Sequence, residues 1–292
     1  MKRILITGKN SYVGTSVKKY LERWPKKYKV DELDVKGNAW KSFDFNKYDV
    51  VFHVAGIAHI NRIKKDEQTK NLYFSVNTDL AEAVAKKAKR EHVKQFIQMS
   101  SMSIYGDSAP IGKKKVIYKN TKPVPTNYYG ESKLQAEIKL NKLTDNSFKL
   151  AILRPPMIYG VNCKGNYAVL RMLALRLRVF PKVKNERSMI YIDNFSEFIK
   201  IAIDNQLCGI FCPSNKETFV TSEIVKEIAK QNNRKILIIP GFSWLLKIMS
   251  HVTPFVNKAF GNMAYDSKAI SADLNYWNCS TVDSIRVMES DG

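Results

Sequence analysis

Near its N-terminus the chain reads Arg3-Ile4-Leu5-Ile6-Thr7-Gly8-Lys9-Asn10-Ser11-Tyr12-Val13-Gly14. The short apolar run at residues 3–7 is typical of a buried strand. The amphipathic pattern that starts at Tyr12 predicts a helix over residues 12–23. Gly8 permits a tight turn between the two, and Gly14 permits close packing of the helix against the strand. A strand, a tight turn and a helix in this order predict the first unit of a parallel α/β sheet.

This turn also has the form of a dinucleotide-binding fingerprint, in which backbone N–H groups at a helix start face a pyrophosphate. The candidate cofactor-binding residues here are Gly8, Ser11, Tyr12, Val13 and Gly14. Ser11 stands where the fingerprint has its middle glycine. Its Cβ should crowd the closest approach of backbone to phosphate, although its hydroxyl could donate a hydrogen bond instead. Taken alone, the turn is equally compatible with a plain βα turn that binds no ligand.

Acidic residues after the next strands indicate which dinucleotide would fit. The second predicted strand, residues 28–35, places Asp34 at its end, 26 residues after Gly8. A carboxylate at this place suits a ribose diol and disfavours a 2′-phosphate, which favours NAD over NADP. Lysines nearby could still accept a phosphate, so NADP stays open. Asp44 and Phe45 follow as candidates to meet the adenine amino group.

A second group of residues points to proton transfer. Tyr129 and Lys133 are four apart on a predicted helix and therefore share one face. The ammonium can lower the pKa of the phenol and hold a cofactor ribose. The hydroxyl of Ser101, at the end of a predicted strand, can hydrogen-bond the same substrate oxygen. Together the three side chains can move a proton on or off an alcohol while a hydride moves on or off its carbon.

The alternation of strand and helix patterns predicts an α/β fold with a doubly wound parallel sheet. The candidate strands are residues 3–7, 28–35, 49–56, 95–101 and 149–155. The candidate helices are residues 12–23, 73–90, 129–144, 194–204 and 221–232. We expect a cofactor-binding domain over residues 1–159, to which residues 188–207 return, and a smaller substrate-binding lobe over residues 160–292.

Cysteine usage and hydropathy favour a cytoplasmic protein without membrane insertion. The four cysteines are scattered, and Cys208 and Cys212 lack partners at zinc spacing, so buried thiols and no metal site are expected. The longest apolar stretch, residues 242–256, is interrupted by Lys247 and His251 and is too short and too polar to span a bilayer. We interpret it as an amphipathic packing segment.

The formal net charge of +21 attracts nucleic acid, anionic membranes and anionic substrates alike. Lysine is spread through the whole chain and no nucleic-acid-binding motif accompanies it, so we expect no nucleic-acid partner. A lysine-rich surface that reflects coding bias is the preferred explanation. Steering of an anionic substrate, and loose association with a membrane-bound partner, are hypotheses.

Together these residues resemble the extended short-chain dehydrogenase/reductase family, of the NAD-dependent epimerase/dehydratase type, whose members act on nucleotide sugars. The resemblance covers nearly the whole chain, and the combination of motifs is specific. The matching positions are Thr7–Gly14, Val51–Gly56, Asn77, Ser100–Gly106, Tyr129, Lys133, Arg154–Gly160, Lys164–Asn166, Arg187–Ser188 and Tyr191–Asn194. Among its subfamilies the chain is most similar to the C4-ketoreductases and 4-epimerases that act on UDP-N-acetyl sugars for capsule and O-antigen.

The resemblance implies a role for each matched position. Ser101, Tyr129 and Lys133 are the expected catalytic residues, with Tyr129 as general acid/base at the sugar C4 oxygen. Further cofactor-binding residues are Ala55, Gly56, Asn77 and Pro156, beside Tyr129 and Lys133 themselves. The expected substrate-binding residues are Ser101, Ser103, Met157, Asn166 and Arg187, with Arg187 on the diphosphate. A UDP-sugar substrate and a homodimer are the expected partners.

Two departures from the family bear on the reaction. Related 4,6-dehydratases carry an Asp-Glu pair where this chain has Met102 and Ser103, and neither residue can act as a base at neutral pH. Met157 replaces an asparagine that is typical of UDP-galactose epimerases. We therefore expect reduction of the C4 ketone of a UDP-4-keto-6-deoxy-N-acetylhexosamine. A UDP-sugar 4-epimerase that retains NAD is the alternative, and a non-catalytic dinucleotide-binding sensor or scaffold is a minor one.

Overall fold

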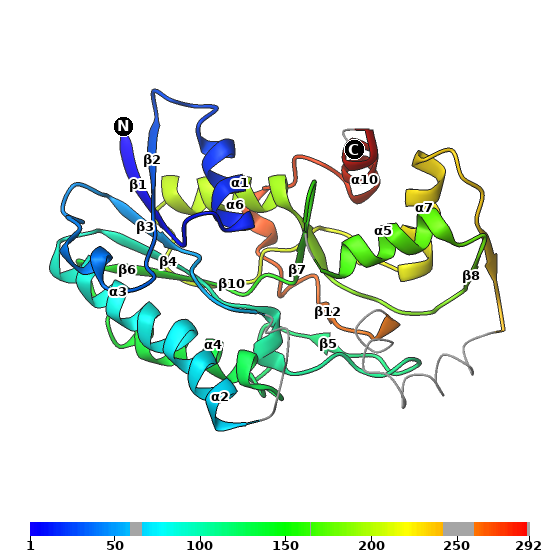
Figure 1. Cartoon of the computed structure of the whole chain (residues 1–292), viewed down its shortest axis with the longest axis horizontal. Helices are drawn as coiled ribbons and strands as arrows, with labels where there is room; N and C mark the ends of the chain where they lie inside the picture. Colours follow the sequence, from blue (N-terminus) through cyan, green and yellow to red (C-terminus); the bar gives the residue numbers. More distant parts are fainter. Residues whose placement is uncertain (59–65, 164, 242–259, 291–292) are drawn as a thin grey trace. The chain divides into compact units, whose positions relative to one another are not determined.

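The computed structural model describes residues 1–58, 66–163, 165–241 and 260–290 (Figure 1). Lys164 and the stretch 242–256, both named above, lie outside these residues. The contacts divide the chain into two compact units. Unit 1 comprises residues 1–106, 122–155 and 196–213, and unit 2 comprises residues 107–121, 156–195 and 214–292. The assignment of a cofactor lobe and a substrate lobe stays a prediction.

Unit 1 is built on a six-stranded sheet whose strands are all parallel. In spatial order the strands are β10 (Gly209–Phe211), β6 (Lys149–Leu153), β4 (Gln95–Met99), β3 (Val50–His53), β1 (Lys2–Thr7) and β2 (Tyr28–Leu33). The predicted doubly wound parallel sheet is therefore confirmed. The strand predicted over residues 3–7 ends where β1 ends, whereas the other four predicted strands of this sheet end two or three residues too late.

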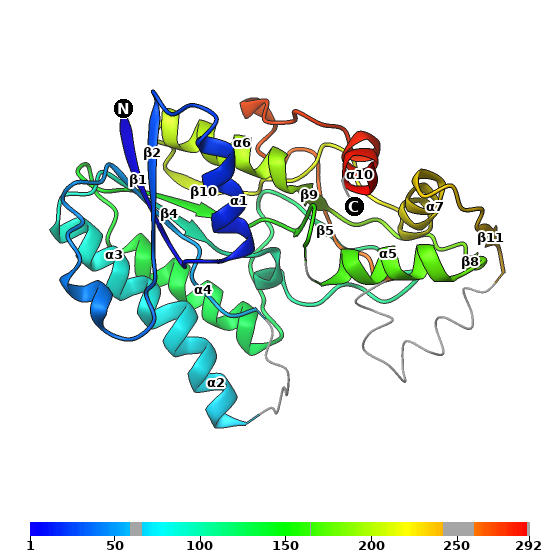
Figure 2. The ribbon, with the colours of Figure 1, turned by 45° about the horizontal axis from the view of Figure 1, so that its top comes forward.

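Helices cover both faces of this sheet (Figures 1 and 2). On one face lie α1 (Tyr12–Leu21) and α6 (Ile192–Asp204). On the other lie α2 (Glu67–Phe74), α3 (Leu80–Arg90) and α4 (Tyr128–Asn141). The core between sheet and helices is apolar and fully buried; Leu5, Val51, Phe96, Val84 and Leu140 are members of it.

The helix predicted over residues 73–90 differs from the structure. α2 already begins at Glu67, because the side chain of Asp66 accepts a hydrogen bond from the N–H of Thr69 and caps the helix. A π-helical segment, Ser75–Asp79, then separates α2 from α3. This local widening places Asn77 at the wall of the site described below, in keeping with the frequent occurrence of π-segments at functional sites.

The chain order of the strands reverses at β1, since β2 lies on one side of it and β3 on the other. In open α/β sheets, ligands bind outside the carboxyl ends of the strands at such a switch point. The residues at this point are Gly8, which follows β1, and Ala55 and Gly56, which follow β3. The topology thus leads to the turn that the sequence singled out.

The described residues of unit 2 form helices and three small parallel strand pairs. The pairs are β7 (Met157–Tyr159) with β9 (Met189–Tyr191), β8 (Val179–Pro181) with β11 (Leu237–Ile239), and β5 (Val116–Ile117) with β12 (Ala264–Tyr265). The helices are α5 (Asn166–Arg176), α7 (Thr221–Gln231) and α10 (Thr281–Ser290). Short 3₁₀ segments occur at Ala39–Ser42 and Met102–Tyr105 in unit 1 and at Ala272–Leu274 in unit 2.

Two chemical expectations can be compared with the described residues. Within the described ranges, no helix is both long and apolar enough to pass through a membrane. The cysteines are free; Cys212 is buried as expected, whereas Cys208 is exposed, because it lies in the turn before the edge strand β10.

Candidate active site

The turn after β1 has no room for side chains at its two glycines. Gly8 has a φ of +115°, and a Cβ there would lie 2.7 Å from the backbone nitrogen of Ala55. A Cβ on Gly14 would lie 2.6 Å from the Oγ of Ser11 and 3.0 Å from the side chain of Ile6. Such distances are far below normal contact, so any larger residue would push helix α1 away from the strands. The two glycines thus set the close approach that a dinucleotide site needs.

Ser11 caps the helix that follows. Its Oγ accepts a hydrogen bond from the N–H of Gly14 at 3.1 Å, and its backbone has the extended conformation of an N-cap residue. One of the N–H groups that could face a phosphate is therefore already used inside the protein. The hydroxyl proton of Ser11 is still available for donation, which is the role expected for it. Tyr12 and Val13 form the first turn of α1.

The acidic candidates are accessible, but Phe45 is not. Asp34 is exposed just beyond β2, and one of its carboxylate oxygens accepts from the N–H of Lys36 at 2.9 Å. Asp44 is exposed as well. The side chain of Phe45 is fully buried in the core, and its N–H donates to the carboxylate of Glu91 at 2.8 Å. Phe45 is therefore a core residue here, because its hydrophobic ring is more stable there than beside a ligand.

Ser101 and Ser103 lie together at the end of β4. Ser101 is the N-cap of a short 3₁₀ segment: its Oγ accepts from the N–H of Ser103 and donates to the Oγ of Ser103, both at 3.1 Å. Both serines are partly exposed, whereas Met102 between them is buried. The hydroxyls of Ser101 and Ser103 are therefore accessible to a sugar oxygen, whereas the thioether of Met102 is not.

Tyr129 and Lys133 lie on α4, as the spacing predicts. Burial raises the pKa of the Tyr129 phenol, and a hydrogen bond with Ser101 opposes that rise. Burial lowers the pKa of Lys133 to about 8, while Glu137 acts in the other direction. The Lys133 ammonium donates to the carbonyl of Met99 at 2.9 Å. The pKa of the phenol is therefore raised overall in the cofactor-free structure; Ser101 opposes the rise, and the Lys133 ammonium is held at the strand end.

Asn77 connects the cofactor side to the catalytic helix. Its amide exchanges two hydrogen bonds with the backbone of Ile57, at 2.9 and 3.0 Å, and donates to the Oγ of Ser132 at 3.0 Å. A Cβ on Gly56 would lie 2.9 Å from the Oδ1 of Asn77 and 3.0 Å from the Nζ of Lys133. Ala55, Gly56, Asn77 and Lys133 therefore form one connected wall, and their assignment to the cofactor stays a prediction.

A buried charged network beneath this wall was missed in the sequence. Glu137 accepts from the guanidinium of Arg154, with the shortest N–O distance at 2.6 Å, and from the hydroxyl of Ser100. Arg154 also donates to the hydroxyl of Tyr105 at 2.8 Å. The available signal was the position of Glu137, four residues after Lys133 on the same helix face. The network ties α4 to the ends of β4 and β6.

His53, also missed, lies at the end of β3 with no exposed surface. Its Nδ1 lies 2.7 Å from the hydroxyl of Thr7. Burial, together with the nearby positive charge of Lys133, lowers the pKa of His53 to about 3. The ring is therefore neutral at physiological pH, which leaves Lys133 as the cation at the carboxyl ends of β3 and β4.

The remaining candidates lie in unit 2. Pro156 is buried, and Asn166 begins α5. Met157 and Arg187 line one small pocket, of about 10 Å³, together with Phe219. Burial lowers the pKa of the Arg187 guanidinium to about 10, so it is charged at neutral pH. Arg187 is half-buried, and its contact with a diphosphate stays a prediction.

Comparison with known proteins agrees with this geometry. A model of the "NAD dependent epimerase/dehydratase family" matches residues 4–209, more than half of the chain. The chain belongs to this family. The protein is therefore an NAD(P)-dependent enzyme of the nucleotide-sugar epimerase/dehydratase type, and the resemblance drawn from its motifs is confirmed. The site fits NAD(P) in three respects. Its glycines leave no room for a Cβ, Asp34 is exposed, and a helix N-terminus lies at the switch point.

Two curated members of the family are similar to this chain over much of its length. "UDP-glucose 4-epimerase" of Vibrio cholerae is 29% identical over 91% of this chain and 87% of its own length. "N-acetyl-alpha-D-glucosaminyl-diphospho-ditrans,octacis-undecaprenol 4-epimerase" of Escherichia coli O157:H7 is 29% identical over 59% of this chain and 53% of its own length.

Solved members share the fold. UDP-glucuronic acid 4-epimerase from Bacillus cereus, in complex with NAD, superimposes with a TM-score of 0.74 at 17% identity, covering 99% of this chain and 97% of its own. UDP-N-acetylglucosamine 4-epimerase from the same organism gives 0.75 at 15% identity, covering 99% of both chains. At such identities the likeness establishes the fold alone.

Proposed function

We propose that this enzyme is a UDP-sugar 4-epimerase, the alternative that the sequence left open. The observation that carries the proposal is the group of Ser101, Tyr129 and Lys133 at the carboxyl end of the sheet, with the buried Met102 beside it. This group can oxidise and reduce an alcohol carbon but offers no carboxylate for elimination of water. The names of the two similar curated relatives, both 4-epimerases, support the choice over a one-way reductase.

The chain's own residues account for the proton side of the reaction. Tyr129, as phenolate, removes the proton from the C4 hydroxyl of the sugar, and Ser101 donates a hydrogen bond to the same oxygen. A bound NAD would supply the hydride chemistry at C4 in both directions. The Lys133 ammonium stabilises the phenolate form of Tyr129 through its positive charge. Once the sugar has turned the other face of its C4 ketone toward the cofactor, Tyr129 would return the proton to the C4 oxygen.

The substrate side rests on Arg187 and Met157. A half-buried guanidinium can bind a diphosphate by two parallel hydrogen bonds, and Met157 in the same pocket offers apolar contact. We propose that Asn166 and Ser103 contact the nucleotide and the sugar, respectively. NAD is proposed over NADP, because the exposed Asp34 would repel a 2′-phosphate.

The test is a coupled assay for interconversion of UDP-glucose with UDP-galactose, and of UDP-GlcNAc with UDP-GalNAc, without added cofactor. Tyr129→Phe should lower kcat by about 10²- to 10⁴-fold, the usual contribution of a general acid/base. Its NAD content should stay unchanged, because the phenyl ring keeps the packing. Equal rates for the variant and the wild type would contradict the proposal.

A second candidate is the reduction of a UDP-4-keto-6-deoxy-N-acetylhexosamine. Met157 favours it, because an asparagine is typical of UDP-galactose epimerases at this position. Absorbance at 340 nm, with the keto sugar and NADH or NADPH, separates the two. Stoichiometric loss of absorbance that Tyr129→Phe abolishes, without any epimerisation, would replace the first proposal by this one.

A further inference from the structure

Four large apolar side chains of unit 2 are exposed along one continuous stretch of structure. Met172 is on the outer side of α5, Leu177 follows that helix, Val179 is in β8 and Leu237 is in β11. Val179 is 47% exposed and Leu237 is 63% exposed. Single exposed apolar residues are ordinary, but residues that neighbour one another mark a contact surface.

The strand pairing brings two of them side by side. The strands β8 and β11 are adjacent (Figure 2), and in their parallel register Val179 is the direct partner of Leu237. Directly paired residues point to the same face of a sheet, so the two side chains protrude together. Phe180, the next residue along β8, points to the other face and is buried. The strand pair of β8 and β11 thus buries the face that carries Phe180 and exposes the face that carries Val179 and Leu237. This exposed face is the apolar edge considered below.

The chain segments that form β8 and β11 and their flanks are rich in positive charge. Residues 170–185 include Arg171, Arg176, Arg178, Lys182 and Lys184 and no acidic residue, and residues 228–241 include Lys230, Arg234 and Lys235 and no acidic residue. Arg176, Arg178 and Lys235 are exposed, and the described part of the chain offers them no ion pair. Apolar side chains at the centre and cations around them complement a surface that has a hydrocarbon interior and negative headgroups.

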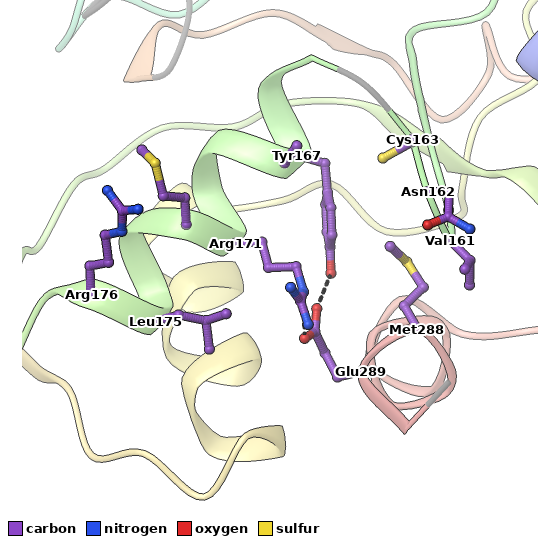
Figure 3. Close-up of a pocket in the computed structure, with 12 residues that line it drawn as sticks. Val161, Asn162, Cys163, Tyr167, Arg171, Leu175, Arg176, Met288 and Glu289 are labelled. Atoms are coloured by element: carbon purple, nitrogen blue, oxygen red, sulfur yellow. Dashed lines mark hydrogen bonds and ion pairs between the residues drawn. The ribbon is translucent and has the colours of Figure 1, made fainter. Parts of the chain in front are cut away.

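A cavity of about 580 Å³ adjoins the same helix (Figure 3). Met172 and Arg176 line it while also being exposed, so the cavity opens toward this surface. Deeper inside, Arg171 and Tyr167 contact the carboxylate of Glu289, at 2.8 and 3.5 Å, and hold α5 to α10. The rim thus combines a cation with a flexible apolar side chain, which suits a lipid headgroup and the start of its chain.

We propose that this surface, formed by Met172, Arg176, Leu177, Val179, Lys235 and Leu237, docks the enzyme on an anionic phospholipid bilayer. The docking is peripheral: Leu177, Val179 and Leu237 enter the headgroup region, and the surrounding arginines and lysines attract anionic lipid. Neither contribution is sufficient alone, since stable attachment to membranes takes two signals.

Vesicle flotation tests the proposal directly. The full chain should float with vesicles of phosphatidylcholine containing 30% phosphatidylglycerol and should not float with phosphatidylcholine alone. Each cation near the surface contributes about fivefold to partitioning, so Arg176→Gln with Lys235→Gln should weaken binding about 25-fold. Val179→Ser with Leu237→Ser should weaken it about tenfold through lost apolar contact. Epimerase activity in solution should not change in either variant.

Matched controls separate the surface from the overall charge. The double variant Lys26→Gln with Lys27→Gln changes two exposed lysines of unit 1 and has the same net charge as Arg176→Gln with Lys235→Gln. Val124→Ser removes an exposed apolar side chain of unit 1. Both controls should bind vesicles as the wild type does. An equal loss in the lysine control would overturn the proposal, as would failure of the wild type to float. Binding of a single-stranded oligonucleotide that depends on Arg176 and Lys235, without flotation, would make this a nucleic-acid surface instead.

Discussion

The hydroxyl of Ser11 both caps helix α1 and occupies the place of a fingerprint glycine, and these two roles predict different effects of mutation. Ser11→Ala should destabilise the protein by about 1 kcal/mol through loss of the cap, and Ser11→Gly by only a few tenths. Ser11→Gly also releases the N–H of Gly14 for phosphate and removes a Cβ, so NAD should bind several-fold more tightly. Calorimetric titration with NAD and thermal unfolding measure both effects. Weaker binding by both variants would instead mean that the hydroxyl itself bonds the phosphate.

Lys133 makes stability depend on pH in a defined direction. Its pKa is lowered to about 8 by burial, whereas in the unfolded chain it is near 10.4. Between these values the unfolded state binds more protons, so folding stability rises with pH in this window and falls as pH decreases toward 8. Lys133→Met lacks this dependence. The difference in free energy of unfolding, wild type minus variant, should grow by up to about 1.4 kcal/mol per pH unit from pH 8 to 10.

Urea unfolding of the cofactor-free protein at several pH values measures this difference. A constant difference across the window would contradict the lowered pKa. The pH dependence of the wild type alone would not suffice, because other groups titrate in the same range. The variant cancels them, since they are common to both proteins.

For single residues, the sequence predicts those arrangements that follow from the spacing of residues within one helix or strand. Tyr129 and Lys133 are four apart, so their shared helix face follows from helix geometry. The burial of Phe45 and the pairing of Glu137 with Arg154 depend on tertiary packing between segments far apart in the chain. The role of Ser11 as an acceptor was also outside reach, because it depends on the direction of one N–H group. Functional residues that follow from local sequence patterns were therefore predicted, whereas interactions that depend on tertiary packing were not.

Among the elements, α4 carries the catalytic pair and is anchored by the buried ion pair between Glu137 and Arg154. Breaking such a pair leaves an uncompensated buried charge, so Glu137→Gln should cost about 3–5 kcal/mol of folding stability. Because Glu137 also raises the pKa of Lys133, the variant should lose activity at a lower alkaline pH than the wild type. Chemical denaturation and a pH–rate profile measure the two effects.

Glu131→Gln on the same helix is the matched control. Glu131 is only partly buried and lies two residues from Tyr129, so its loss should change stability by less than about 0.5 kcal/mol. A stability loss in Glu137→Gln without any shift of the pH profile would limit the network to a structural role.

Element prediction succeeded where one periodicity dominates. Most strands of the central sheet contain a short apolar run, such as residues 4–6 in β1 and residues 50–52 in β3, and five of its six strands were located from such patterns. α5 was missed, because apolar residues occur all around its short length and no side chain caps its start. β10 was missed because it is a three-residue edge strand, in which Ile210 is exposed. Short elements whose burial is set by their neighbours leave a weak signal in the sequence.

For the molecule as a whole, the net charge of +21 acts on an anionic nucleotide sugar before any contact forms. A large positive field raises the encounter rate of a negative ligand, and salt screens it over about 10 Å at 0.1 M. If the substrate is a UDP-sugar, KM should rise several-fold between 50 and 500 mM NaCl while kcat stays constant. Steady-state kinetics with NaCl, repeated with Lys26→Gln and Lys27→Gln together, measures the effect. That variant still has a net charge near +19 and should retain almost all of the salt dependence.

Arg187→Met, by contrast, removes a direct contact with the substrate rather than the long-range electrostatic field, so it should raise KM at every salt concentration. An unchanged KM in the wild type across the salt series would exclude electrostatic steering of the substrate. Binding of anionic lipid by unit 2 would then be the remaining proposed role of the positive charge.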